Sequence, residues 1–337
     1  MLKKRLGVLF LCTVCGANAK QLSPSSTDII ATWPASVSSK MTYQQAIDIL
    51  DKAKQLGSTS ADIKALSHVI SRRESQRNLD DKFTYIKASL LQRNHDFEAA
   101  KEQLVTLNTP QSKLLLASVY NNLGQFENSL QTCKSLVSHS AHLVALTCML
   151  DARFQQSPSV KWYQQLTQLR RVAKYESAQV LEWVDQTLAF MALALNNPTA
   201  ALTHLPAEEL DQVSVASASL WAQAQLALGR YNHVIDTLGP AANKAAEMDD
   251  GILIMLAQAE QHTGNDTRWQ KQAQQRIAMR EWRKDWSHAA YIARYYLEVK
   301  QDADKAHHFA QVNWQYAKGL EDKQLLSRTV NLVTGEN

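Results

Sequence analysis

Two cysteines and two histidines form the most regular group of reactive side chains in the sequence. Cys133 precedes His139 by six residues, and His142 precedes Cys148 by six. Two thiolates and two imidazoles can hold a tetrahedral zinc ion. Neither half contains the Cys-x-x-Cys pair that is typical of zinc-binding knuckles, and the histidines flank an expected loop. A metal site at these four residues is therefore an alternative interpretation, which would make the chain a metal-handling accessory protein.

The same two cysteines can instead pair with each other. They are the cysteines that lie beyond residue 19, and the helix register described below places them on adjacent antiparallel helices. In an oxidising compartment, an even number of cysteines so arranged favours a disulfide. A bond that closes so short a loop would stabilise the fold by about 3 kcal/mol. Two buried thiols that point apart are the other structural interpretation.

A second concentration of functional side chains lies between Arg268 and Trp286. The basic and aromatic residues of this segment are Arg268, Trp269, Lys271, Arg276, Arg280, Trp282, Arg283, Lys284 and Trp286. Basic residues that alternate with aromatic ones can bind nucleic acid, an acidic peptide or anionic lipid. The favoured interpretation is structural: the tryptophans pack between helices, and the basic residues cover a solvated face.

The sequence contains no motif of a known catalytic site. We find no G-x-S-x-G, no glycine-rich phosphate loop and no H-E-x-x-H. The acidic pair Glu208-Glu209 begins an expected helix, where negative charge complements the helix dipole. The sequence therefore predicts a protein that is not an enzyme and needs no cofactor.

The elements that must position these residues recur along the chain. Gly229 and Gly264 are 35 residues apart, and Gly124 and Gly229 are 105 apart, three times 35. Each of these glycines ends one helical pattern and begins another. The full set of predicted turn residues is His95, Gly124, Pro158, Asn196, Gly229, Gly264 and Gln301, with steps of 29, 34, 38, 33, 35 and 37. A helix–turn–helix unit with a period near 34 is typical of tetratricopeptide repeats.

Side chains around the turns strengthen this pattern. The repeat consensus has small residues where the paired helices approach, an aromatic after the turn and a proline near the end of the unit. Matching residues are Ala88, Phe97, Ala100 and Pro110 in one unit, Ala117, Tyr120, Gly124, Phe126 and Ser129 in the next, Ala222, Gly229, Tyr231 and Pro240 later, and Ala306 and Ala310 in the last. Over residues 80–315 the chain resembles tetratricopeptide-repeat proteins.

Two places resemble a narrower group. The pair Cys133 and Cys148, and the segment 309–315 followed by 322–326, are similar to an uncharacterised family of secreted tetratricopeptide proteins from proteobacteria. The tetratricopeptide resemblance implies an all-α fold, a right-handed superhelical solenoid of stacked helix–turn–helix hairpins. It also implies that the protein binds other chains rather than catalysing a reaction.

The chain divides into five predicted parts. Residues 1–19 read as a signal peptide, 20–40 as a flexible leader, 41–78 as a helical prefix, 79–320 as about seven hairpins, and 321–337 as a capping helix and tail. An apolar stripe from Ala46 to Leu56 predicts that the first prefix helix ends at Gly57. With 45% hydrophobic and 20% charged residues, the composition is that of a globular protein.

The N-terminus carries the features of a secretory signal. Lys3, Lys4 and Arg5 precede a short apolar stretch, and Ala17-Asn18-Ala19 is a cleavage motif. Cleavage after Ala19 removes three of the 36 basic residues and leaves 33 against 32 acidic residues, a net charge of +1. We therefore expect a periplasmic protein with no further membrane span and no nucleic-acid partner.

These expectations combine into a non-enzymatic periplasmic scaffold or adaptor that binds a peptide or protein partner in a concave groove. The predicted groove residues share amide or guanidinium groups that can bond to a peptide backbone. They are Asn121, Asn122, Gln223, Gln225, Arg230, Gln258 and Gln261. A non-catalytic subunit of a cell-envelope enzyme complex is a further alternative. The sequence predicts neither the partner's identity nor the oligomeric state.

Overall fold

The computed structural model describes residues 41–58, 60–138, 142–173, 175–205, 210, 213–244, 248–264 and 267–335. The predicted signal peptide and leader lie outside the described residues. Within these ranges the chain is all-helical, with seventeen α-helices and a single isolated β-bridge. None of the helices in this part of the chain is both long and apolar enough to cross a membrane.

The prefix forms two helices, α1 (Tyr43–Lys52) and α2 (Ser60–Ser75). Thr42 begins α1 through a capping box, in which its hydroxyl accepts the backbone N–H of Gln45 at 3.2 Å. The predicted end of α1 at Gly57 is wrong, because the helix stops at Lys52. The backbone beyond it bonds to a distant segment instead of continuing the helix.

Seven hairpins follow the prefix, and a last helix ends the described chain. They are α3 (Asp81–Arg93) with α4 (Phe97–Leu104), α5 (Pro110–Asn122) with α6 (Phe126–Lys134), α7 (His142–Gln156) with α8 (Val160–Val172), α9 (Ala178–Ala194) with α10 (Pro198–Leu202), α11 (Val215–Ala227) with α12 (Tyr231–Lys244), α13 (Asp250–Thr263) with α14 (Arg268–Arg283), and α15 (Ala289–Tyr295), extended by the π-helical η3 (Tyr296–Lys300), with α16 (Ala303–Tyr316). The short η2 (Trp286–His288) precedes α15, and α17 (Leu320–Thr334) is the predicted capping helix.

The turns within the hairpins share one backbone conformation. Six of the seven predicted turn residues have positive φ: 70° at Gly124, Gly229 and Gly264, 60° at His95, 57° at Asn196 and 56° at Gln301. The exception is Pro158, whose ring holds φ near −65°. The predicted turn positions are therefore confirmed, including those where a residue other than glycine takes the left-handed conformation.

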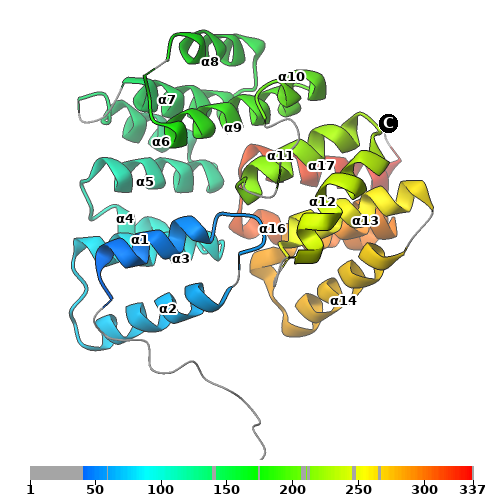
Figure 1. The fold of residues 1–337 in the computed structure, drawn as a ribbon, viewed down its shortest axis with the longest axis horizontal. Coiled ribbons are helices and arrows are strands. Elements are labelled where there is room, and N and C mark those ends of the chain that lie inside the picture. The colour runs from blue at the N-terminus through cyan, green and yellow to red at the C-terminus, as the bar shows by residue number, and fades with distance from the viewer. Residues whose placement is uncertain are drawn as a thin grey trace, which may run out of the picture. The chain divides into compact units, whose positions relative to one another are not determined.

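Successive hairpins pack through their first helices. Helix α5 contacts α3 and α7, and the series continues through α9, α11, α13 and α15 (Figure 1). Small buried residues occupy the crossings: Ala117 is 2% exposed, and Ala88, Ala222 and Ala257 are fully buried. Without bulk at these positions, neighbouring helices can approach closely.

Segments far apart in the sequence also touch. The Lys318 N–H, between α16 and α17, donates to the carbonyl of Asn122 at 2.6 Å. Gly124 makes room for this contact, because a Cβ built there would lie 3.0 Å from both Cβ and the carbonyl oxygen of Lys318. Elsewhere the His95 ring contacts those of His288 and Tyr291, with centroids 5.5 and 6.2 Å apart.

Candidate functional site

A cavity of about 1050 Å³ lies where the N-terminal ends of several first helices meet the turn after α1. Helices α5, α7, α9 and α11 each contribute side chains from their first turns. The successive packing of these helices brings their N-terminal ends to one place. This cavity is the candidate functional site.

Backbone from the turn after α1 forms one wall of the cavity. Its Lys54 carbonyl accepts the Val215 N–H at 2.8 Å, and its Leu56 N–H donates to the Val213 carbonyl at 3.2 Å. Arg93 of α3 donates from Nη1 to the carbonyl of Ala53 at 3.2 Å. The wall is thus attached to α3 on one side and to the start of α11 on the other.

Apolar side chains cover the opposite part of the cavity. They are Leu114 of α5, Leu136 after α6, Val144 of α7, and Val180 and Trp183 of α9. Leu136 is fully buried, whereas the other four keep part of their surface exposed. Partly exposed apolar surface inside a cavity is surface that a ligand can cover.

A polar network borders the cavity between α9 and α11. Glu182 accepts hydrogen bonds at Oε1 from the hydroxyls of Ser214 at 2.9 Å and Ser217 at 3.2 Å. Gln186 donates from Nε2 to Glu182 Oε1 at 3.0 Å and to both serine hydroxyls at 2.9 Å. These bonds hold α9 against the start of α11. They also place the polar side chains of Glu182, Gln186 and Ser214 at the edge of the cavity.

A second cavity, of about 690 Å³, shares Glu182 and Gln186 with the first and lies between α8, α9, the residues after α10 and the start of α11. Arg170 forms a two-pronged ion pair across it, with Nε 2.7 Å from Asp185 Oδ1 and Nη2 2.8 Å from Oδ2. His204 Nε2 lies 2.9 Å from the hydroxyl of Tyr163. Burial is the main cause that lowers the pKa of His204, which favours the neutral imidazole.

Charged groups at the main cavity also have partners within the chain. Lys54 Nζ lies 2.7 Å from Asp51 Oδ1. Asp249 caps α13 by accepting the N–H groups of Gly251 at 2.8 Å and Ile252 at 3.2 Å. Burial raises the pKa of Asp249. The charged residues that line the cavity are therefore three acidic and two basic ones, and each has an ion-pair or hydrogen-bond partner within the chain.

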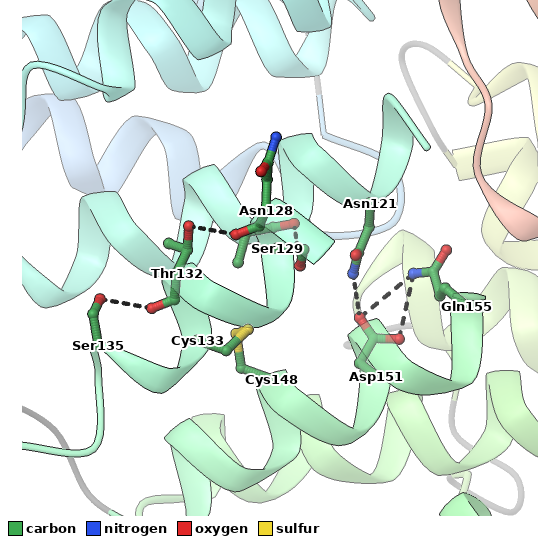
Figure 2. The surroundings of a disulfide bond; sticks show 10 residues. Asn121, Asn128, Ser129, Thr132, Cys133, Ser135, Cys148, Asp151 and Gln155 are labelled. Atoms are coloured by element: carbon green, nitrogen blue, oxygen red, sulfur yellow. Dashed lines mark hydrogen bonds between the residues drawn. A yellow bond between two sulfur atoms is a disulfide. The ribbon is translucent and has the colours of Figure 1, made fainter. Parts of the chain in front are cut away.

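The predicted disulfide is present (Figure 2), and it packs against residues that line the apolar part of the cavity. Cys133 and Cys148 are joined, with their Cα atoms 5.5 Å apart. The bond connects α6 to α7 and is packed with Leu136 and Trp183, which line the cavity. A covalent link therefore supports one wall of the candidate site.

The disulfide also bears on the alternative metal site. Bonded sulfurs offer no thiolate to a metal ion. His142 is exposed at the start of α7, and His139 lies outside the described residues. Among the residues whose placement is described, no group of three or more His, Cys, Asp or Glu side chains is arranged to hold a metal.

The predicted groove residues do not line this cavity. Asn121 is buried and donates from Nδ2 to Asp151 Oδ2 at 3.0 Å, as Figure 2 shows. Asn122 donates its amide to the carbonyl of Ser118 at 2.9 Å, and its own carbonyl accepts Lys318. Asn122 therefore holds the chain's own C-terminal segment at the opposite end of α5, whereas the Asn121 side chain bonds to α7.

A cluster of buried polar groups surrounds this contact. Gln155 donates to Asp151 Oδ1 at 3.3 Å, and Asp322 accepts from Asn313 at 2.7 Å and from the Gly319 N–H at 3.1 Å. Burial is the main cause that raises the pKa of Asp151 to about 6, and it also raises that of Asp322. Within the described residues the Asn121 Oδ1 atom is buried without a hydrogen-bond partner.

The remaining predicted groove residues are scattered. Gln225 is buried and accepts Arg230 Nη1 at 3.3 Å, whereas Gln258 donates to Glu298 at 3.2 Å. Gln223 is half-buried and Gln261 is exposed, and neither lines the two cavities described above. The structure thus brings Asn121 and Asn122 together and leaves the other five apart from them.

Sequence reasoning missed the cavity residues Val180, Trp183, Glu182 and Gln186. They lie on α9, whose sequence reads as a largely apolar helix without a consensus match. A tryptophan and a glutamine three residues apart near its start were the available signal. These residues line a cavity only because the turn after α1, which is far away in the sequence, bonds to the start of α11.

Comparison with protein-family models, with curated proteins and with solved structures found no match for this chain.

Proposed function

We propose that this protein is a periplasmic, non-enzymatic scaffold that binds an extended segment of a partner protein in the main cavity. The observation that carries the proposal is the convergence of α5, α7, α9 and α11 on one cavity with an apolar side and a polar edge. In this proposal the hairpins form a right-handed tetratricopeptide solenoid, and the cavity belongs to its concave side.

The lining of the cavity suits an extended peptide. Its volume of about 1050 Å³ lies at the upper end of the range for ligand sites, about 300–1,000 Å³. The apolar residues would cover alternate side chains of an extended peptide. The amides of Gln111 and Gln179 would bond to its backbone, since an amide offers both a donor and an acceptor, and Gln186 would offer its amide oxygen.

The proposal moves the binding site from the predicted position. The partner uses the N-terminal ends of the first helices, because Lys318 and Gly319 occupy the surface beside Asn121 and Asn122. The predicted signal peptide and the disulfide both fit an oxidising compartment outside the cytoplasm. These two features support the periplasmic part of the proposal.

Site-specific photocrosslinking tests the proposal. A benzophenone amino acid placed at Val144, on the apolar side of the cavity, should capture one partner segment in the native compartment. The same group at Gln165, exposed on α8, is the matched control. An adduct that forms equally from both positions, or from neither, would contradict the proposed site.

A further inference from the structure

The cations of α14 and Lys284 directly after it form two sets, apart from Arg268, which lies over the ring of Trp269. The inward set is neutralised: Arg276 Nη1 and Arg280 Nε each lie 2.5 Å from an oxygen of Asp250, which is 4% exposed. Arg280 also pairs with Asp285. The inward arginines thus belong to the interior of the protein.

The outward set remains in solvent. Lys271, Arg283 and Lys284 are exposed, and within the described residues none of them has an acidic partner. The same side of α14 exposes large apolar side chains, with Met279 49% and Trp282 80% exposed. Positions 271, 279 and 282 share one helix face, because they lie eight and then three residues apart.

The acidic residue of α14 does not offset this charge. Glu281 accepts the Tyr296 hydroxyl at 3.1 Å and lies 3.7 Å from Lys305 Nζ. The Glu281 carboxylate therefore interacts with Tyr296 and Lys305 and not with the exposed cations of α14. We call the outward surface formed by Lys271, Met279, Trp282, Arg283 and Lys284 the basic face of α14.

We propose that the basic face of α14 binds the surface of an anionic phospholipid membrane. Tryptophan is amphipathic and prefers the boundary between lipid and water, and lysine and arginine side chains are attracted to anionic headgroups. A flat lipid surface suits an indole that is 80% exposed. The inference is independent of the peptide site, since α14 does not contribute to that cavity.

The membrane is favoured over an acidic protein because Trp282, which is 80% exposed, lies next to the exposed cations Arg283 and Lys284. An exposed indole beside basic side chains is typical of interfacial anchors, and a lipid surface needs no directional fit to hold it.

Vesicle sedimentation tests this inference with the processed chain, residues 20–337. We expect binding to vesicles of phosphatidylglycerol and phosphatidylcholine that weakens as salt is added, and no binding to phosphatidylcholine alone. Replacing two cations by R283Q/K284Q should weaken binding roughly 25-fold, about five-fold for each charge removed. The variant W282A should also weaken binding, because it removes the interfacial side chain.

The matched control removes two exposed cations from α8 as K161Q/R171Q and should leave vesicle binding unchanged. Tyr175, which is fully exposed, provides Y175A as the control for W282A. Equal losses in the α8 and α14 variants would overturn the inference. So would binding to polyglutamate without binding to vesicles, which would assign the basic face to an acidic protein.

Discussion

At the scale of single residues, the most unusual group is the carboxyl of Asp151. It lies between the amides of Asn121 and Gln155, beside the segment that joins α16 to α17. Burial raises its pKa from 3.8 to about 6, although both amides favour the charged form. At neutral pH the folded protein therefore holds a carboxylate in an unfavourable place.

This shift predicts how stability depends on pH. The folded pKa lies above the unfolded one, so the stabilisation from Asp151 is complete below pH 3.8 and is lost as pH rises through 6. A shift of one pKa unit corresponds to about 1.4 kcal/mol of folding free energy. Because the carboxyl keeps some contact with solvent, we expect Asp151 to contribute about 2 kcal/mol to the pH-dependent part of the free energy of unfolding. Denaturant unfolding of D151N should show a smaller fall in stability between pH 5 and pH 7 than the unmodified chain.

A variant at the exposed Asp81, D81N, controls for the change in net charge. It should keep the pH dependence of the unmodified chain. If D151N and D81N gave the same pH profile, Asp151 would not hold a raised pKa in the folded protein.

At the scale of elements, the disulfide connects α6 to α7 and packs against residues that line the cavity. Both cysteines are buried, and the bond closes a sequence separation of 15 residues. Trp183 of α9 packs against the same cluster. The link therefore supports α6, α7 and α9 and the apolar part of the cavity.

Removing this link should lower stability and weaken binding together. A disulfide that closes a loop of this length stabilises the folded state by about 3 kcal/mol. The free energy of unfolding of C133A/C148A, measured with denaturant, should therefore be lower by about that amount. Its affinity for a captured partner segment should also fall, because Leu136 and Trp183 lose the disulfide against which they pack. A reductant should weaken the unmodified chain and have no effect on C133A/C148A. Unchanged stability after reduction would show that the bond does not constrain the fold.

At the scale of the whole molecule, backbone contacts connect helices that are distant in the sequence. The turn after α1 bonds to the start of α11, and Lys318 bonds to the end of α5. Both contacts lie beside the first helices of the hairpins. The first contact forms a wall of the cavity, and the second covers the opposite end of α5.

Two glycines with the same backbone conformation test the second contact. Gly124 and Gly264 both have φ of 70°, but only a Cβ at Gly124 would meet other atoms within 4 Å, 3.0 Å from Lys318. Alanine in a left-handed conformation costs about 1–2 kcal/mol. The free energy of unfolding of G264A, measured with denaturant, should therefore be lower by that amount. G124A should lose more, because the backbone of Lys318 must also move. Equal losses would mean that the segment is not held against α5.

The sequence predicted the local architecture well. The spacing of Gly124, Gly229 and Gly264 indicated the period, and the other turns were placed between successive helical patterns, at steps of 29 to 38 residues. The disulfide followed from the register of α6 and α7. These features depend on neighbouring residues or on one repeat, so their signals are contained within short stretches of sequence.

The cavity could not be predicted in this way. It requires the backbone at Lys54 to meet Val215. At the predicted groove residue Asn122, Lys318 approaches from nearly two hundred residues away. Apart from these contacts, a buried amide such as that of Gln225 and an exposed one such as that of Gln261 look alike in the sequence. Long-range contacts, rather than repeat consensus, decide which polar residues face a ligand.

The affinity of the captured segment for a charged cavity variant tests the central claim most directly. V180E places a carboxylate on the apolar side of the cavity, at a helix start where glutamate is well tolerated. V160E makes the same change at the exposed start of α8, where Val160 is 53% exposed. Fluorescence anisotropy with the labelled segment should show binding weakened at least about ten-fold by V180E, from burying an unpaired charge, and unchanged by V160E. Equal affinities for V180E, V160E and the unmodified chain would contradict peptide binding in this cavity.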